Sequence, residues 1–299
     1  KNTPILEIVD FLNARARENQ WGFVDFNRPM VAINQWEQAE DSMYTLCGKD
    51  RIHPSTDGHL VMAYLFLKAQ GLAGKPVADI RIDGAGKKVT RSDNCRVSDL
   101  SVSSDNLTFT YEAKSLPYPI DTSYYDNEKH TQADALSVIP FMDEMNYEGL
   151  SVSGLSDGYY GLTIGREFIG RFTARELERG INMALLQNTP QYKQAMKIRQ
   201  MNEERWLKER KMREFYWVEY NLMRKTGMLW ACDEAAVDTL RKYRPHDIFL
   251  QWNGDLWLQY MHKGIREDCV NEQQDLVNRI YEQNKPIPLR IEIKKFTDL

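Results

Sequence analysis

Apolar positions at the start of the chain recur at helical spacing and then give way to one continuous apolar run. Thr3 and Pro4 are typical of a helix start, and the apolar positions that follow predict a helix over about residues 3–19. Residues 21–26 are rich in strand formers and predict a short buried strand with helices on both faces. A helix followed by such a strand indicates an α/β layer.

A second helix and a strand-rich stretch follow. Ser55 or Thr56 can cap a helix that Gly71 would end. From residue 77 to about residue 173 the pattern changes to short alternating runs separated by turn residues, which predicts mostly strands. The clearest of these runs are residues 77–82, 107–111 and 160–164.

One helix is predicted inside this strand-rich stretch, over residues 131–145, although Pro140 is unfavourable in a helix interior. Beyond residue 174 the pattern is helical throughout. The predicted helices cover residues 175–186, 192–225 (closed by Gly227), 232–242 and 267–283.

Five of the seven tryptophans fall in this helical part. Trp206 and Trp217 are eleven residues apart, which places them on one helix face and predicts that both belong to the core. Trp252 and Trp257 lie beside Asn-Gly-Asp and are the better candidates for stacking on a sugar ring. The mixed charges of residues 203–211 indicate a solvated helix face.

Composition excludes several classes of protein. The 299 residues (35.0 kDa) suffice for about two domains. Lys+Arg 39 against Asp+Glu 43 leaves a net charge of -4, which does not favour binding to nucleic acid. The longest apolar run, residues 60–67, is far too short to cross a bilayer, and the mean hydropathy is -0.57.

The cysteines and the first residues leave the compartment open. Cys47, Cys95, Cys232 and Cys269 are widely spaced, which argues against a structural zinc site and against a dense disulfide framework. Whether they are free or paired stays open. Since the first residues lack a secretory signal, the chain begins at a cytosolic start, a processed end or a cut inside a longer protein.

Candidate chemistry concentrates in residues 47–59, between the predicted strand and the second helix. Asp50 lies three residues before His53 there. A general base needs an imidazole with one nitrogen free and the other held in one tautomer by a carboxylate, which Asp50 and His53 can supply. On spacing alone, a surface aspartate that caps a loop beside an unrelated histidine is the favoured interpretation.

The surrounding residues resemble the last sequence block of the SGNH/GDSL hydrolases. Asp-x-x-His-Pro at positions 50–54 is followed by Asp-Gly-His-Leu-Val-Met-Ala at positions 57–63. Residues 24–30 are similar to the final strand and following loop of bacterial members of that family. Further downstream, residues 109–119 and 164–184 resemble the accessory region of a bacterial subgroup.

This resemblance implies a Ser-His-Asp esterase without a cofactor, in which His53 takes the serine proton and Asp50 orients the imidazole. The family's serine lies in a Gly-Asp-Ser motif on the first strand. No Gly-Asp-Ser occurs in this chain, and only 49 residues precede Asp50. The nucleophile and most of the catalytic sheet are therefore expected in a companion N-terminal segment outside these 299 residues.

The expected fold class is α/β. Residues 1–75 would form the C-terminal part of a three-layer α/β/α (flavodoxin-like) SGNH domain, residues 76–174 a β-rich accessory region and residues 175–299 a helical region. Without a companion, the apolar residues 21–26 and 60–67 would be exposed and would promote aggregation.

Other motifs are better interpreted as structure. Ser156 lies in a literal G-x-S-x-G motif, but a strand follows where a nucleophile elbow needs a helix, so we expect a turn residue in a β-hairpin. Residues 83–88 predict a hairpin turn without a cofactor. His59 is expected to pack behind the catalytic loop rather than to bind a metal. His130, His246 and His262 stand alone in the sequence.

The sequence thus predicts an ester hydrolase acting on acyl esters, with an acetylated carbohydrate as the favoured substrate. The resemblance favours the bacterial periplasm or secretion, although a cytoplasmic location stays open. The alternative is a catalytically silent fragment that binds carbohydrate or another protein and keeps the His53 loop without a nucleophile.

Overall fold

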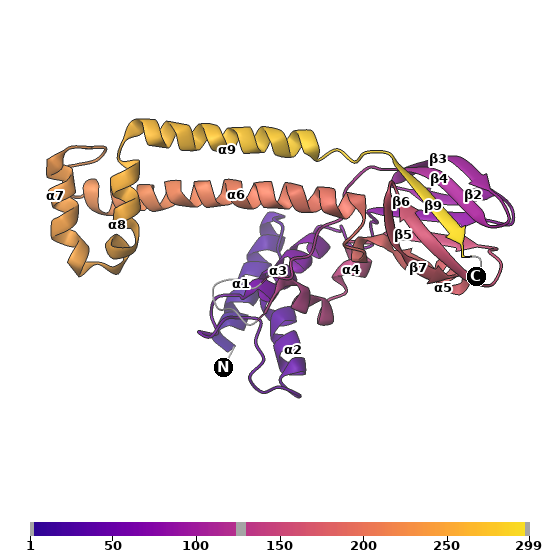
Figure 1. The fold of residues 1–299 in the computed structure, drawn as a ribbon. Helices are drawn as coiled ribbons and strands as arrows, with labels where there is room; N and C mark the ends of the chain where they lie inside the picture. Colours follow the sequence, from indigo (N-terminus) through magenta and orange to yellow (C-terminus); the bar gives the residue numbers. More distant parts are fainter. Residues whose placement is uncertain (1–2, 124–129, 297–299) are drawn as a thin grey trace. The chain divides into compact units, whose positions relative to one another are not determined.

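The computed structural model describes residues 3–123 and 130–296, and its contacts divide the chain into two compact units. The first unit comprises Lys1–Lys193 and Pro286–Leu299, and the second comprises Gln194–Lys285. Figure 1 shows the elements of both. The mixed α/β class is confirmed.

The first unit contains two β-sheets. One sheet has the strand order β2-β1-β5-β8, and the other has the order β3-β4-β9-β6-β7. The pair β1–β5 is parallel, whereas the remaining neighbours are antiparallel. The strands are β1 (Ala78–Asp83), β2 (Lys88–Asp93), β3 (Cys95–Val102), β4 (Asn106–Ala113), β5 (Glu148–Ser153), β6 (Tyr159–Ile164), β7 (Glu167–Thr173), β8 (Ile181–Asn182) and β9 (Leu289–Lys295).

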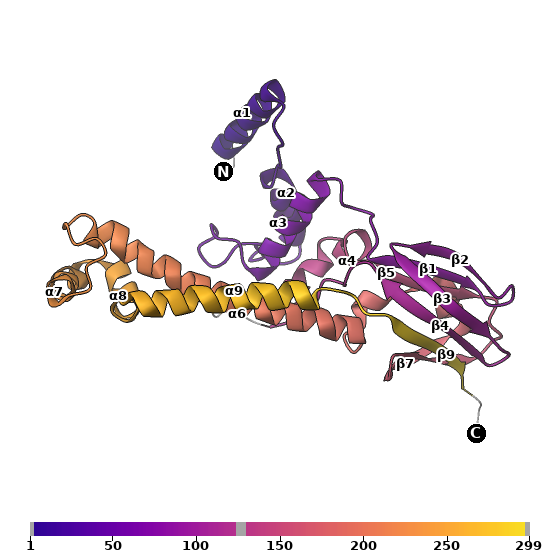
Figure 2. The same cartoon turned by 90° about the horizontal axis from the view of Figure 1, so that it is seen from above.

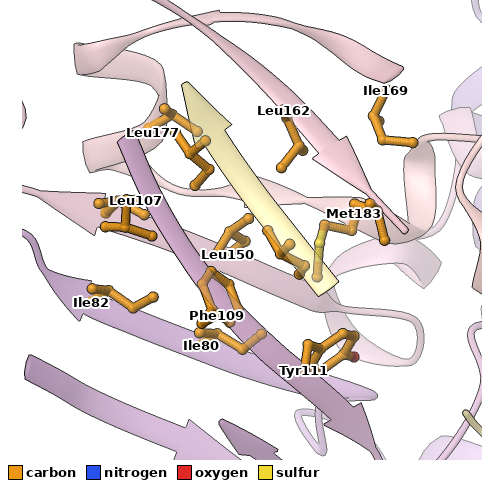
Figure 3. Packing of buried hydrophobic residues seen from close by; sticks show 14 of the residues in the cluster. Ile80, Ile82, Leu107, Phe109, Tyr111, Leu150, Leu162, Ile169, Leu177 and Met183 are labelled. Atoms are coloured by element: carbon orange, nitrogen blue, oxygen red, sulfur yellow. The ribbon is translucent and has the colours of Figure 1, made fainter. Parts of the chain in front are cut away.

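Buried side chains from both sheets form one core cluster, which Figure 3 shows from close by. Ile80 and Leu150 come from the first sheet, and Phe109 and Leu162 come from the second. All four are at most 1% exposed, so each contributes roughly 1.5–3 kcal/mol of hydrophobic stabilisation. The two sheets therefore pack face to face as a sandwich.

Short helices complete the first unit. A 3-10 helix, η1 (Gln132–Ser137), precedes α4 (Phe141–Glu144), and α5 (Ala174–Arg179) is followed by a 3-10 turn, η2 (Met183–Leu185). A capping box in which Thr173 and Glu176 bond each other's backbone amides starts α5, and Gly180 with φ +94° ends it.

The N-terminal part of this unit, from residue 3 to residue 75, contains α1 (Thr3–Asn19), α2 (Asn27–Glu37) and α3 (Thr56–Ala69). Figure 2 shows these helices from above. Leu60, Val61 and Tyr64 of α3 share a buried cluster with Ala135 of η1 and Phe141 of α4. This packing fixes the start of α3, where the candidate loop ends.

The second unit is helical. α6 (Pro190–Val218) continues into a π-helical turn, η3 (Glu219–Met223), and is followed by α7 (Glu234–Tyr243), a 3-10 turn η4 (Arg244–His246), α8 (Ile248–Tyr260) and α9 (Lys263–Gln283). Both ribbon views show α9 beside α6. Lys208 bonds Glu272, and Gln194 bonds the carbonyl of Gln283, so the two helices run antiparallel. Phe215, Leu240 and Trp257 belong to this unit's core.

The predicted buried strand at residues 21–26 is wrong. These residues have no regular structure, and Trp21 is 66% exposed. An isolated strand leaves its backbone amides and carbonyls unpaired, and the described residues 3–75 supply no neighbouring strand, only the bridge between Cys47 and Pro54. The three-layer arrangement expected for residues 1–75 is therefore not formed by these residues themselves.

Two predicted helices are shorter than expected. The helix predicted over residues 131–145 is split into η1 and α4, because Pro140 has no N–H and lies between them. The helix predicted over residues 175–186 ends at Gly180, after which the chain enters β8. The remaining predicted helices are confirmed as α1, α3, α6, α7 and α9, with altered ends.

Three elements were not predicted. α2 occupies residues expected to form a loop, and α8 contains the Asn-Gly-Asp sequence that resembles a turn. A Cβ on Gly254 would lie 3.2 Å from Arg244 Nε, so a glycine inside α8 allows this arginine to pack closely. β9 lies in the region predicted as helical, and its Ile291 pairs with Phe109 and Ile164 at the centre of the second sheet.

Candidate active site

The loop that carries Asp50 and His53 is closed at its base by backbone hydrogen bonds. The amide of Ser55 donates to the carbonyl of Leu46 (3.0 Å), and the amide of Gly48 donates to the carbonyl of His53 (2.8 Å). Arg51 adopts φ +57°, a left-handed conformation that turns the chain at the tip. The short ladder therefore holds residues 47–54 in one compact turn.

Within this turn, Asp50 and His53 form the pair that the sequence suggests. His53 Nδ1 lies 2.6 Å from Asp50 Oδ2. Asp50 Oδ1 also accepts hydrogen bonds from the backbone amides of Ile52 (2.9 Å) and His53 (3.1 Å). The aspartate thus orients the imidazole and is itself held by the turn.

These contacts favour the ionised form of the aspartate. The His53 imidazole and the two backbone amides lower the pKa of Asp50 to about 2. Since Nδ1 faces the carboxylate, Nε2 is the ring nitrogen that points away from it. The tautomer with a proton on Nδ1 follows from this hydrogen bond.

The pair faces solvent in the described part of the chain. The side chain of His53 is 83% exposed and that of Asp50 is 48% exposed, and the neighbouring Ile52 is 73% exposed. A dyad that performs acyl transfer works best where water is excluded. The loop is thus pre-formed but uncovered.

The other candidate residues lie elsewhere. Ser156 occupies a turn between β5 and β6, where its hydroxyl contacts Tyr160 Oη (3.1 Å) and accepts from Lys295 Nζ (2.7 Å). A strand follows Ser156, as expected, but β5 and β6 belong to different sheets, so the predicted hairpin is wrong. The predicted turn at residues 83–88 joins the antiparallel pair β1–β2 and is confirmed.

His59 lies in the first turn of α3, where its Nδ1 is 2.9 Å from the carbonyl of Ser55. The residue is exposed, so it does not pack behind the loop. No group of three or more His, Cys, Asp or Glu that could hold a metal occurs among the described residues. The four cysteines are free thiols.

The tryptophans differ from the prediction. Trp206 is 46% exposed, so the predicted core stripe is wrong for this residue, whereas Trp217 packs partly buried against the helical core. Trp257, one of the two better candidates for stacking on a sugar ring, is fully buried and donates from Nε1 to Glu219 (2.7 Å). Trp252 is 67% exposed. The predicted solvated face is confirmed by ion pairs such as Arg213–Glu209.

Sequence reasoning missed a second contact between an aspartate and a histidine. Asp57, in the first turn of α3, lies 3.5 Å from His130 Nδ1, although 73 residues separate the two in the chain. Its carboxylate is 1% exposed. No sequence spacing could reveal this contact, because it depends on how residues 130–145 pack on α3.

The β-sandwich, the exposed loop with Asp50 and His53, and the helical unit together define a mixed α/β protein. The family model for the diltiazem deacetylase C-terminal helical domain matches residues 196–285, nearly the whole second unit. No curated protein matches the chain. In the described residues, no helix is long and apolar enough to cross a membrane.

A solved structure described as a gut microbial diltiazem-metabolizing enzyme is similar over almost the whole chain. The sequence identity is 42% and the TM-score is 0.92. The match covers 99% of this chain and 67% of that one. The chain therefore belongs to the family of this enzyme.

Proposed function

We propose that this chain is the acid–base part of a serine ester hydrolase of the SGNH type. In this proposal His53 is the general base and Asp50 orients it, while the nucleophilic serine lies in a segment outside these 299 residues. The observation that carries the proposal is the 2.6 Å contact between His53 Nδ1 and Asp50 Oδ2, with Nε2 left for a reacting proton.

The proposed reaction uses both nitrogens of the His53 imidazole. His53 Nε2 takes the proton of the serine hydroxyl as the serine oxygen bonds to the ester carbonyl carbon. The same nitrogen then protonates the leaving alcohol when the ester C–O bond breaks. Water, activated by His53, hydrolyses the acyl-enzyme and regenerates the serine. Throughout, the Asp50 carboxylate stabilises the imidazolium.

The similar enzyme supports both the chemistry and the location of the serine. That enzyme metabolises diltiazem, and the matching helical domain is named for a diltiazem deacetylase. Deacetylation of an ester is acyl transfer to water, the reaction class that an Asp–His pair serves. The match leaves one third of that chain without a counterpart here, which is room for a segment with a nucleophile.

Exposed apolar side chains on α1 support a covering segment. Ile5, Ile8, Phe11 and Leu12 are each 49–59% exposed. Four large apolar side chains on one helix are typical of a surface that another part of a protein covers. In the same proposal, the covering segment also shields the exposed His53 from water.

For the substrate we propose an acetyl ester, carried by a carbohydrate in the protein's own setting. Beside Asp50 and His53, the loop carries two other exposed charged side chains, Lys49 and Arg51. In this proposal, recognition of the alcohol falls to the covering segment. An acetyl group is small and needs little apolar surface beyond Ile52.

Labelling with a fluorophosphonate serine probe tests the proposal. The protein from its natural source should give an adduct, seen by denaturing intact mass, on a companion polypeptide or on a chain longer than 35.0 kDa. His53→Ala should abolish labelling, because the serine loses its base. His59→Ala is the matched control and should label normally.

The opposite result favours the alternative function. A single unlabelled species at 35.0 kDa would show that the His53 loop has no nucleophile. The chain would then be a binding fragment, for carbohydrate or for another protein.

A further inference from the structure

Asp57 is a buried carboxylate next to the candidate loop, and the mechanism above does not use it. Asp57 is 1% exposed. Its Oδ1 accepts hydrogen bonds from the amide of Gly58 (2.8 Å) and from the hydroxyl of Ser55. Its Oδ2 is buried and has no hydrogen-bond partner among the described residues. The imidazole of His130 lies beside it, with Nδ1 3.5 Å from Oδ2.

Ser55 connects this carboxylate to both ends of the loop. The hydroxyl of Ser55 lies within hydrogen-bonding distance of Asp57 Oδ1 and, at 3.1 Å, of the Leu46 carbonyl. The amide of Ser55 donates to the same carbonyl. Leu46 precedes the turn and Ser55 follows it, so Asp57 is connected through Ser55 to the base of the turn that carries His53.

His130 joins this network from a distant part of the first unit. It lies directly before η1, and its ring packs edge-on against Tyr44 with a centroid separation of 6.1 Å. Burial, and next the negative charge of Asp57, raise the pKa of Tyr44 to about 12. Tyr44 therefore stays neutral, and the imidazole of His130 is the side chain that lies beside Asp57 Oδ2.

A buried carboxylate with one free oxygen is costly to keep. Desolvation of a charge costs several kcal/mol even after relaxation, and a neutral side chain of the same size would avoid that cost. Asp57 lies in the first turn of α3, where the helix dipole favours a negative charge. Such a charge persists where a charge-assisted hydrogen bond must hold one geometry, here the bond to Ser55.

We propose that Asp57 is a positioning residue for His53, acting through Ser55 on the base of the loop and anchored by His130 to the segment before η1. The proposal rests on the proposed hydrolase function for its kinetic consequence. Its structural consequence, the geometry of the Asp50–His53 pair, can be measured without a substrate.

The structural test is a ¹³C NMR titration of the Asp50 carboxyl group. In the parent this group should titrate near pH 2, because His53 and the amides of Ile52 and His53 stabilise its ionised form. In Asp57→Ala the loop base loosens, these contacts lengthen and the midpoint should move up towards the ordinary value near 4. Ser55→Ala should shift it in the same direction, because it breaks the same connection while keeping the contact between Asp57 and His130.

Asp143→Asn is the matched control, since it removes an exposed carboxylate from α4 and should leave the titration unchanged. An unchanged Asp50 midpoint in both Asp57→Ala and Ser55→Ala would overturn the proposal. If Asp57→Ala does not fold, the Asp50 midpoint in Ser55→Ala alone decides whether the proposal stands.

The kinetic test uses the protein from which the serine probe gives an adduct. Displacement of a catalytic group by about 1 Å costs roughly 10²-fold, so Asp57→Ala should lower kcat by about that factor with KM unchanged. Asp57→Asn keeps an oxygen for Ser55 and should recover part of the loss. A fall in kcat without a change in the Asp50 midpoint would contradict positioning. A shifted midpoint in a protein without any esterase activity would uphold positioning and refute the hydrolase.

Discussion

The loop of residues 47–54 and the core of the β-sandwich each hold a carboxyl group in a hydrogen-bonded network, and the two networks favour opposite forms. Asp50 is 48% exposed, and its contacts with His53 and two amides lower its pKa to about 2. Glu148, on β5, is fully buried and accepts from Tyr111 Oη (2.8 Å) and Gln191 Nε2 (3.2 Å). Burial raises the pKa of Glu148 to about 7, although both hydrogen bonds act in the opposite direction.

The opposite pKa shifts of Asp50 and Glu148 distinguish a group that a substrate can reach from a group that only stabilises the core. In the loop, hydrogen bonds dominate and keep a charged aspartate beside an imidazole whose outer nitrogen is free. In the core, desolvation dominates and the glutamate has no exposed face through which a substrate could reach it. A shifted pKa alone therefore does not mark a catalytic group, and access must accompany it.

Removal of the His53 imidazole should have the largest effect, because it deletes the partner of Asp50 in the loop. If the proposed mechanism holds, His53→Ala should lower ester turnover by about four orders of magnitude, because the serine loses its general base. Steady-state kinetics with an acetyl ester measures this, and circular dichroism should show an unchanged fold because the side chain is exposed. Near-parental turnover in His53→Ala would remove His53 from the mechanism.

Asp50→Asn should slow turnover by about 10³-fold, since the amide no longer stabilises the imidazolium and favours the wrong tautomer. Above pH 4, the Asp50→Asn variant should still fold. In the parent, the ionised Asp50 stabilises the folded state above its unfolded pKa near 3.9, and this contribution is lost as the pH falls through about 2. Equal turnover of Asp50→Asn and parent would show that the aspartate has no catalytic role.

Local patterns predicted the loop and most helices because these depend on short-range signals. Asp50 and His53 are three residues apart in one turn, and residues such as Thr3 and Gly227 mark helix ends. β9 had a readable signal as well, because its apolar residues alternate with charged ones over Leu289–Lys295. Its position between β4 and β6 was not readable, since those partners lie more than 120 residues upstream.

Long-range packing explains the remaining errors. The apolar run at residues 21–26 has strand propensity, but a strand forms only where a neighbour pairs with its backbone. Asp57 and His130 meet because α3 packs against η1 and α4, and neither residue signals the other in sequence. The solvent exposure of His53 likewise depends on atoms outside the loop.

Gly58 packs tightly against the base of the loop. A Cβ on Gly58 would lie 2.0 Å from the Leu46 carbonyl oxygen, a backbone atom that cannot move without opening the turn. Gly58→Ala should therefore destabilise the first unit by about 3 kcal/mol, seen as a lower melting temperature of that unit. Gly22→Ala is the matched control, because a Cβ there meets nothing within 4 Å. Equal melting temperatures for the two variants would show that the loop base yields readily.

The smallest expected effect concerns buried Glu148 and the pH dependence of the protein's stability. The folded protein holds the proton of Glu148 up to about pH 7, whereas the unfolded chain releases it near 4.5, so stability falls as the pH rises between these values. Between pH 5.5 and pH 7 the loss should be about 2 kcal/mol, from 1.36 kcal/mol per pH unit. Glu148→Gln stays neutral at every pH and should gain this amount relative to the parent over the same interval, measured by thermal unfolding at each pH. Ester turnover should not change in Glu148→Gln, because this carboxyl group has no route to a substrate. A parallel pH dependence of stability in parent and variant would mean that the buried glutamate is already ionised, and that hydrogen bonds outweigh desolvation in the core as they do in the loop.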